Sequence, residues 1–600
     1  MTFAHRLLKS NKPHHFLLGL LAGLGLLVTR NAHATDYYVA TTGSDANTGT
    51  IDQPFATLQK GVNMAGAGDT VYIRGGTYSI VTPTNSGSGI TFSKSGTSDT
   101  NRIKYWAYNG EQPIFDFSQM VISTTGYTHG FVVTGSWLHF KGLEIMGVPM
   151  NMFSNNGVAV NGGGNDIFEL LNMHHNSGNG IFIGKGGGGH LILNCDAHDN
   201  YDPTSNQGDG QNADGFGLHY QTTGAVSTFR GCRSWWNSDD GFDFINQEYP
   251  GVIENCWAFA NGYIKSGTAR PGAGNGNGFK VGSSTTGVRH TVTNSVAWKN
   301  VENGFYANHS LGGNDWFNNT SFMNGTQYNM LATDPTTSST AVILMGTLVH
   351  KMRNNIGFPN KNQNMDGVDT QFNSWDLGLT PANADFVSTA TTVDEAFAIG
   401  PRQADGSLPN IDFMKLAAGS KMIDKGTDVG LPYVGAAPDL GAYEYGATSA
   451  GGAAGAASGG AAGASGTTST GGTAGAAGTA GAGVGAAAGV GAGAAAGAGA
   501  AAGTDASGGF TTGGQATGGD VGTGGSVSAG GGPSSGGANA GNTGISSAGT
   551  DTRAAANSAN SPGCSCKVIG SSKHAPTGSL WLSIGAAALA LSRRRRRGAA

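Results

Sequence analysis

Five short segments in the middle of the chain share one pattern of apolar and polar positions. Each contains a glycine followed by an apolar residue, a variable residue and another apolar residue; they are NGIFI (179–183), NADGFGL (212–218), NSDDGFDF (237–244), NGNGFKV (275–281) and NGFYA (303–307). Alternation with a period of two predicts a strand with one buried face and one exposed face. Aligning the segments on their glycines predicts one column of exposed positions: Phe182, Gly217, Asp243, Lys280 and Tyr306.

A second repeat, built from asparagine, sets the register of these strands. Six residues separate the members of the pairs Asn194/Asn200, Asn255/Asn261, Asn294/Asn300 and Asn318/Asn324, and Gly231 holds the same place before Asn237. Short strands that repeat with Gly/Asn turns are typical of a solenoid. Asparagines stacked at a turn favour a parallel β-helix, because each amide can hydrogen-bond to the next one. A β-sandwich would instead show evenly spaced turns and hairpin signals.

The distance from the second asparagine to the glycine varies, which predicts loops at one corner of each coil. It is four residues in 237–241 and 300–304 but far longer in 200–215 and 261–278. These longer loops are expected beside the column that contains Asp243 and Lys280.

A short amphipathic helix is predicted ahead of the repeats. Phe55, Leu58 and Val62 have helical spacing, and Pro54 suits the first turn of a helix. Such a helix would cover the open N-terminal end of the solenoid. Early strands are expected at 71–74, 102–108, 113–117, 131–135 and 138–145, and a strand at 341–349 is expected to precede the last coils and a C-terminal cap that ends near 445.

The two ends of the chain differ in composition from this folded part, which we place at 35–446. Residues 1–34 combine basic residues, an apolar run and Ala32-His33-Ala34, which predicts a secretory signal peptide and an exported protein. Residues 447–562 are almost entirely Gly, Ala, Ser and Thr, the composition of a flexible, disordered linker.

The segment 563–600 is interpreted as a surface tag. It contains Cys564 and Cys566, an apolar run at 580–591 and five arginines at 593–597. This order resembles the C-terminal sorting tags of myxobacterial surface proteins, which implies cleavage near the cysteines and display at the cell surface. The alternative is an intact membrane anchor, so membrane association through this segment is either transient or permanent.

Charge and cysteine content exclude some classes of function. The net charge is −5, and the sequence has no stripe of basic residues of the kind that binds nucleic acid. Binding to nucleic acid is therefore not expected. Three cysteines follow equivalent turn positions and are expected to stack inside the coils: Cys195, Cys232 and Cys256. The sequence does not decide whether two of them form a disulfide. The histidines His174, His175, His219 and His290 are interpreted as surface polar groups, and the folded part is expected to be a monomer.

Four carboxylates are expected to meet on the exposed face. Asp214 and Asp240 precede equivalent glycines on adjacent coils, Asp239 precedes Asp240, and Asp243 lies in the exposed column. Turn positions explain Asp214 and Asp240 individually but not Asp243, which falls within a strand. Like charges this close need a cation, and a cluster of oxygen ligands suits Ca²⁺ better than Mg²⁺.

Lys280 follows Asp243 in the same column, one coil further on. It is either a salt-bridge partner of weak effect or a general base whose pKa is lowered by a nearby cation. A base beside a cation that neutralises a uronate carboxylate is the arrangement that β-elimination requires. Hydrolysis would instead use two carboxylic groups at a fixed separation.

The motifs NADGFGL, NSDDGFDF and GNGNGFKVG, in this order and spacing, resemble those of the family 9 polysaccharide lyases. The resemblance covers about 36–329. It implies a right-handed parallel β-helix with pectate lyase activity on polygalacturonate, in which Asp214, Asp239, Asp240 and Asp243 bind calcium and Lys280 is the Brønsted base. No family motif identifies the residues that bind flanking sugars. Candidates for binding their carboxylates, chosen by proximity to these coils, are Arg233, Lys265, Arg270 and Arg289.

Two other functions fit parts of the sequence. The first is a lyase that acts on another uronate polymer, such as alginate or a host glycan. The second is a non-catalytic adhesin or glycan-binding solenoid on the cell surface, which the linker and tag suit but the Asp243–Lys280 pair does not.

Overall fold

The computed structural model describes residues 34–85, 87–205, 208–272, 274–334, 336–337 and 340–447. Apart from Ala34 and Ala447, the predicted signal peptide (1–34), linker (447–562) and tag (563–600) lie outside the described residues. Two α-helices, α1 (Leu58–Met64) and α2 (Thr391–Ala398), and 3₁₀ turns at Asp99–Asn101, Gly346–Leu348 and Asn383–Asp385 accompany the strands.

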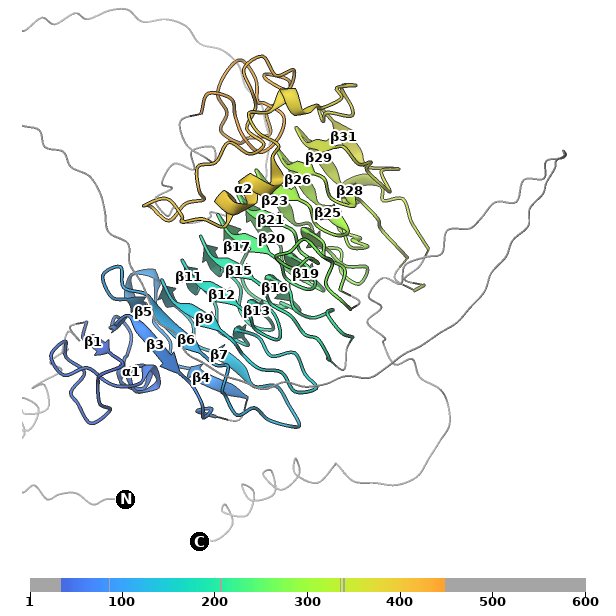
Figure 1. The fold of residues 1–600 in the computed structure, drawn as a ribbon. Helices are drawn as coiled ribbons and strands as arrows, with labels where there is room; N and C mark the ends of the chain where they lie inside the picture. The colour runs from blue at the N-terminus through green and yellow to red at the C-terminus, as the bar shows by residue number, and fades with distance from the viewer. Residues whose placement is uncertain are drawn as a thin grey trace, which may run out of the picture. The chain divides into compact units, whose positions relative to one another are not determined.

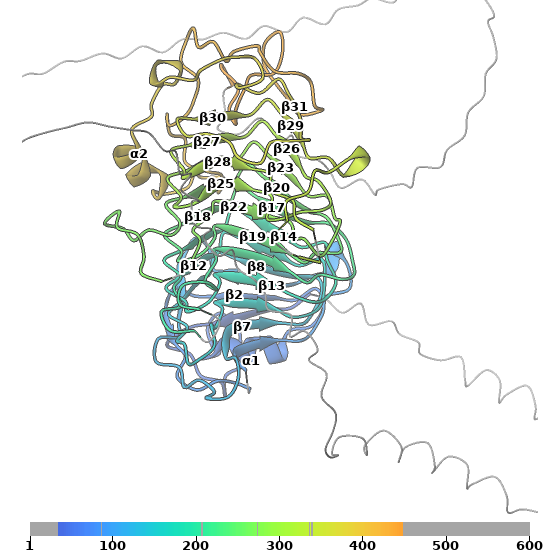
Figure 2. The same ribbon diagram turned by 90° about the vertical axis from the view of Figure 1, so that its right-hand side faces the viewer.

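The chain winds through three parallel sheets, one strand of each in most coils (Figures 1 and 2). Sheet 1 has the order β1 (Asp36–Val39), β2 (Thr70–Ile73), β5 (Ile103–Ala107), β8 (Leu138–Lys141), β11 (Ile167–Glu169), β14 (Leu191–Leu193), β17 (Ser227–Arg230), β20 (Gly251–Glu254), β23 (Thr291–Thr293), β26 (Asp315–Phe317), β29 (Lys351–Arg353) and β31 (Asp369–Gln371). Sheet 2 contains β4 (Ser88–Phe92), β7 (His129–Val133), β10 (Val158–Val160), β13 (Ile181–Ile183), β16 (Phe216–His219), β19 (Phe242–Ile245), β22 (Phe279–Val281), β25 (Asn303–Tyr306) and β28 (Thr326–Asn329). Sheet 3 contains β3 (Gly76–Ser79), β6 (Pro113–Asp116), β9 (Glu144–Met146), β12 (Asn172–His174), β15 (Asp196–His198), β18 (Arg233–Trp235), β21 (Trp257–Phe259), β24 (Val296–Trp298), β27 (Thr320–Phe322) and β30 (Ile356–Phe358). The predicted right-handed parallel β-helix is confirmed.

The predicted register of sheet 2 is also confirmed. Gly217 pairs with Asp243, Asp243 with Lys280, and Lys280 with Tyr306 on successive strands. On the inner face, Phe216, Phe242, Phe279 and Phe305 stack with ring centroids 4.8–4.9 Å apart. All four rings are fully buried, so this column forms part of the core that aligns the coils.

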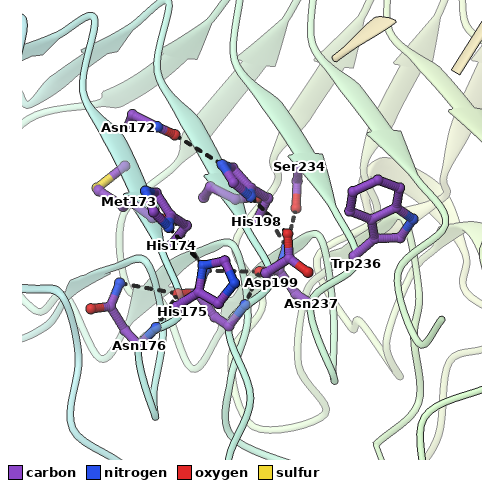
Figure 3. Close-up of polar contacts among 12 residues, drawn as sticks. Asn172, Met173, His174, His175, Asn176, His198, Asp199, Ser234, Trp236 and Asn237 are labelled. Atoms are coloured by element: carbon purple, nitrogen blue, oxygen red, sulfur yellow. Dashed lines mark hydrogen bonds and ion pairs between the residues drawn. The ribbon is translucent and has the colours of Figure 1, made fainter. Parts of the chain in front are cut away.

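Buried asparagines satisfy the backbone at the turn between sheets 3 and 2. Each side-chain amide of Asn176, Asn200, Asn237, Asn261 and Asn300 donates to the Oδ1 atom of the next asparagine in the series, which ends at Asn324, over 2.8–3.1 Å. Figure 3 shows Asn176 and Asn237 at this turn. At most 1% of any of these side chains is exposed, so the ladder is an internal scaffold that sets the spacing of the coils.

The first member of each asparagine pair serves the turn between sheets 1 and 3. Asn194, Asn255, Asn294 and Asn318 have φ between 48° and 54°, a left-handed conformation that asparagine tolerates better than most residues. Gly231 takes their place in one coil with φ 65°, and a Cβ atom there would lie 2.1 Å from Asn194 Oδ1. A side chain at position 231 would therefore have to displace the Asn194 amide.

Helix α1 covers the N-terminal end of the solenoid, as predicted (Figure 1). Its N-cap is Thr57, whose side chain accepts a hydrogen bond from Lys60 N, so Pro54 precedes the helix instead of forming its first turn. Leu58 and Val62 are buried, and Phe55, which lies before the helix, bridges to β1 at Val39.

The C-terminal part of the chain differs from the prediction. In place of a strand at 341–349 there is a 3₁₀ turn, and the coils continue to β31. The following residues fold back along the outer face of sheet 3, where α2 lies on the same side as β18 and β27 (Figure 2). A second apolar core forms there, because Trp257, Phe259 and Trp298 face outward and pack with the C-terminal segment.

Charged contacts anchor this C-terminal segment far back along the solenoid. Arg402 pairs with Asp196 at 2.6 Å, and Asp196 also pairs with Arg233 at 2.5 Å. Arg233 in turn donates to the carbonyl oxygen of Ala398 at the end of α2. The C-terminal segment therefore covers the outer face of sheet 3 in addition to the end of the coils. The alternation of apolar and polar residues within each strand could not predict this long-range packing.

The predicted internal column of Cys195, Cys232 and Cys256 is present. All three are fully buried and carry free thiols. None of the helices in the part of the chain that the structure describes has the length and hydrophobicity needed to cross a membrane.

Replacing Asn237 with alanine tests the ladder. The Asn237 amide donates to Asn261 Oδ1 and Ser234 Oγ, and its Oδ1 atom accepts from Asn200, so the change leaves several buried polar groups unsatisfied. We expect the free energy of unfolding of residues 35–447 to fall by roughly 2–4 kcal/mol in denaturant titrations. Asn383→Ala, at an exposed position, is the control and should leave it unchanged. An equal effect of both substitutions would contradict a scaffold role.

Candidate active site

A groove of about 770 Å³ runs along the outer face of sheet 2, across the coils from β7 to β22. Its floor and walls come from the strands and from the corner loops predicted beside the exposed column. The lining residues are Tyr127, His129, Ser154, Asn156, Asn161, Asn179, Phe182, Gln211, Asn212, Asp214, His219, Tyr220, Asp239, Asp243, Ile245 and Lys280.

Two of the predicted carboxylates replace asparagines in a second ladder, just before sheet 2. Asp214 Oδ1 accepts a hydrogen bond from Asp240 N at 3.0 Å. Asp240 Oδ1 accepts from both N and Nδ2 of Asn277, at 2.9 and 2.6 Å. Because a carboxylate uses only one oxygen to continue the ladder, its second oxygen is left for another partner.

Asp239 and Asp243 complete the cluster. Asp239 Oδ1 accepts a hydrogen bond from Asn275 N in the long corner loop. Asp243 projects from β19, and its Oδ1 atom has no hydrogen-bond partner among the described residues. One carboxylate oxygen from each of Asp214, Asp239 and Asp240 lies within 4.8 Å of the other two.

The prediction that these carboxylates are exposed is wrong. Asp214, Asp239, Asp240 and Asp243 are 0–4% exposed, and Lys280 is 6% exposed. The strand alternation correctly turns Asp243 away from the apolar core. It does not account for neighbouring side chains and corner loops, which cover this part of the outer face.

Burial and mutual repulsion disfavour the charged forms of three carboxylates. Burial, followed by the charges of the other aspartates, raises the pKa of Asp214 well above its usual range. Burial and the charge of Asp240 do the same for the pKa of Asp239, and burial also raises the pKa of Asp240. Burial alone would raise the pKa of Asp243 too, but nearby Lys280 and His219 hold it below its usual value.

Lys280 is the positive charge within the cluster. Its Nζ atom lies 2.9 Å from Asp240 Oδ2 and 3.4 Å from Asp243 Oδ2, so its shorter contact is with Asp240 and not with the predicted partner. Burial by itself lowers the pKa of Lys280, but the charges of the aspartates outweigh burial and raise the pKa well above its usual value. The lowered pKa predicted for Lys280 is therefore not found among these side chains alone.

His219 is a site residue that the sequence interpretation missed. Its Nε2 atom lies 3.3 Å from Asp243 Oδ2, and its ring packs edge-on against Phe182. The available signal was its position two residues after Gly217, which continues the alternation and places it on the outer face of β16.

Two of the other three histidines, His174 and His290, depart from the surface role predicted for them. His175 is exposed, but His290 is buried and accepts a hydrogen bond from Gly251 N. His174 is largely buried on the outer face of sheet 3, where its ring stacks on His198 at 4.8 Å (Figure 3).

None of the four predicted carboxylate-binding cations lines the groove. Arg233 is engaged by Asp196, and Arg289 pairs with Asp315. Arg270 donates to the carbonyl oxygen of Trp236, and Lys265 lies over the Trp236 ring. Nearness in sequence to the site did not identify groove residues, because each of these side chains has its partner outside the groove lining.

The comparisons with known proteins agree with this fold. The family described as "Pel9A-like, right handed beta helix region" matches residues 37–355. Pectate lyase L of Dickeya chrysanthemi is 37% identical over 409 residues, covering 68% of this chain and 90% of that protein. Pectate lyase L of Paenibacillus polymyxa is 32% identical over 417 residues, covering 66% and 85%.

Two solved structures resemble the chain over most of their own length. The crystal structure of pectate lyase Pel9A superimposes with a TM-score of 0.58 at 35% identity, covering 68% of this chain and 96% of that one. A rhamnogalacturonan lyase superimposes with a TM-score of 0.57 at 33% identity, covering 64% and 97%. This chain belongs to the Pel9A-like family of right-handed β-helix proteins.

Proposed function

We propose that this protein is a calcium-dependent pectate lyase, which cleaves polygalacturonate by β-elimination and releases 4,5-unsaturated oligogalacturonides. Membership of the polysaccharide lyases follows from its family and its relatives. The observation that carries the mechanism is the contact of the Lys280 amine with Asp240 and Asp243, in a buried cluster of four carboxylates of which three line the groove.

The four aspartates fit a divalent cation. A cluster of four carboxylates with one lysine has an excess of negative charge at a site that excludes most water, and three of the carboxylates have raised pKa values. All the carboxylate ligands are oxygens, which suits Ca²⁺, and Asp243 Oδ1 has no other hydrogen-bond partner among the described residues. Asp214, Asp239, Asp240 and Asp243 would hold the ion. When bound, it supplies positive charge that neutralises the uronate carboxylate, acidifies the C5 hydrogen and offsets the carboxylates that favour the Lys280 ammonium.

Lys280 supplies the base of the elimination. Its neutral amine removes the proton from C5 of the uronate, electrons move to form the C4–C5 double bond, and the glycosidic oxygen leaves C4. The column geometry directs the amine into the groove, since Phe279 and Val281 on either side are fully buried in the core. Asp240 and Asp243 fix the position of the Nζ atom between them.

This arrangement favours elimination over the alternatives. Hydrolysis would depend on two carboxyl groups acting as acid and base and has no role for a lysine in the cluster. A purely adhesive protein has no need of a buried amine among four carboxylates. Another uronate polymer remains the second candidate, since one similar structure is a rhamnogalacturonan lyase.

Export and surface display belong to the same proposal. The signal peptide, the Gly/Ala-rich linker and the arginine-containing tag support a lyase domain that works outside the cell, held by a long linker. Pectate is too large to enter the cell, so cleavage at the surface suits this substrate.

Replacement of Lys280 tests the base. With calcium present, Lys280→Met and Lys280→Arg should each lower the turnover of polygalacturonate by roughly 10²–10⁴-fold, because arginine keeps the charge but gives up a proton far less readily. Ultraviolet absorbance of the unsaturated product measures the rate. Lys265→Met, outside the groove, is the control and should turn over polygalacturonate at the wild-type rate. Near-normal rates for both Lys280 variants would make this residue only an ion-pair partner.

Chelation tests the cation. We expect it to abolish turnover and added Ca²⁺ to restore it, while circular dichroism changes little. The aromatic stack and the asparagine ladder that hold the coils together are built from residues other than the four carboxylates. The melting temperature should rise with calcium by mass action. Loss of β-structure on chelation would instead make the ion part of the fold.

Asp214→Asn separates ion binding from folding. Asn179 and Asn277 occupy the same ladder on other coils, so asparagine suits this position and removes one carboxylate whose buried charge is unfavourable. Calorimetry should show calcium affinity reduced by at least about tenfold, because one of four charged ligands is lost. In chelator the variant should melt no lower than the wild-type protein. Unchanged calcium affinity would remove Asp214 from the ligand set.

A further inference from the structure

The end of the groove near β7 differs chemically from the end near Lys280. Among the described residues that line the groove, Lys280 is the one lysine or arginine. Toward β7 the lining consists of neutral polar and aromatic side chains: Tyr127, His129, Ser154, Asn156, Asn161 and Phe182. Among the described residues that line this end, a chain of uronates would find no lysine or arginine to pair with its carboxylates.

Tyr127 is the main aromatic surface at this end. Its side chain is 43% exposed although its ring stacks on His129, with ring centroids 5.4 Å apart and an angle of 19° between the planes. The Phe153 ring supports it from a neighbouring loop at 4.9 Å. Asn151 Nδ2 donates to the carbonyl oxygens of Ser123 and Gly126, which ties the two loops together. The ring is therefore held in place ahead of any ligand.

The neighbours of Tyr127 do not supply positive charge. Burial lowers the pKa of His129 to about 4, so its imidazole is neutral at the pH of most extracellular surroundings. His129 Nδ1 accepts a hydrogen bond from Asn156 N at 3.0 Å, which fixes the orientation of the ring. Of the four cations expected from sequence to bind flanking carboxylates, Arg233, Arg270 and Arg289 are engaged elsewhere, and Lys265 lies over the Trp236 ring outside the groove.

We propose that the β7 end of the groove is a distal subsite for an uncharged pyranose, a methyl-esterified galacturonate unit, held against the exposed ring of Tyr127. The assignment rests on the proposed lyase function. Five coil steps separate β7 from β22, so the subsite lies about 24 Å along the groove from Lys280. Only a substrate that extends several sugars from the cleaved bond reaches it.

Two physical effects favour an esterified unit there. Aromatic rings bind the apolar C–H faces of sugars, and Tyr127 contributes contact area with little loss of side-chain entropy because its loop is already braced. An ionised carboxylate in a partly enclosed groove without a cation is disfavoured, since it loses water and gains no charged partner. An ionised galacturonate unit is thus needed at the Lys280 end of the groove, whereas its binding is unfavourable at the β7 end.

The test compares two polymers and one short substrate on the calcium-loaded protein. The polymers are fully de-esterified polygalacturonate and partially methyl-esterified homogalacturonan, and the short substrate is trigalacturonate, which cannot span five coils. The variants are Tyr127→Ala, Tyr127→Phe, which keeps the ring, and Tyr433→Ala, a control at a similarly exposed tyrosine (42%) that does not line the groove. KM and kcat are measured from the absorbance of the unsaturated product.

We expect the wild-type protein to have a lower KM for the esterified polymer than for polygalacturonate. Tyr127→Ala should raise the KM for the esterified polymer roughly five- to tenfold, with kcat and the kinetics on trigalacturonate unchanged. Tyr127→Phe and Tyr433→Ala should behave as the wild type.

Three results would overturn the subsite while leaving the lyase function intact. They are an equal or lower KM for polygalacturonate, no effect of Tyr127→Ala on the esterified polymer, and a loss of kcat on trigalacturonate, which would show a structural role. No unsaturated product from either galacturonan would overturn the proposed function itself.

Discussion

Everything in this structure depends on the stacking of coils in register at the spacing of a parallel sheet. Each turn between sheets must bury polar groups without a neighbouring hairpin to satisfy them, and the asparagine ladder does so by passing a hydrogen bond from one coil to the next. The phenylalanine column on the inner face repeats at the same spacing. Side chains at equivalent positions therefore become neighbours however long the intervening loops are.

The site is a local change in the second ladder, which runs through Asn179 and Asn277 just before sheet 2. Where other coils carry asparagine, two adjacent coils carry Asp214 and Asp240, which still accept the backbone hydrogen bonds of the scaffold but lack a donor to continue the chain of amides. The scaffold thereby holds two carboxylates one coil apart and leaves an oxygen of each for other partners. Asp239 and Asp243 on the same coil, and Lys280 on the next, use the same spacing.

The outer surfaces of sheets 2 and 3 differ. The outer face of sheet 3 is aromatic and is covered by the C-terminal segment, which Arg402 and Arg233 anchor to Asp196. Much of the outer face of sheet 2 carries the groove, whose corner loops bury the carboxylates without filling the space along the coils. The face that carries the chemistry is thus also the one that accommodates a polymer.

Period-two alternation and the asparagine spacing determined the parallel β-helix, the register of sheet 2 and the alignment of Asp214, Asp240, Asp243 and Lys280, because in-register stacking converts sequence equivalence into spatial adjacency. The resemblance to family 9 polysaccharide lyases supplied the handedness. The tertiary structure alone decided the burial of the carboxylates, the closer contact of Lys280 with Asp240, the approach of His219 and the return of the C-terminal segment along sheet 3. These features depend on loops and on contacts between residues far apart in the chain, which follow no repeat. The same reason explains why Arg233, Arg270 and Arg289 could not be placed from sequence: their side chains take partners outside the groove, and only the folded coils show which face each one occupies.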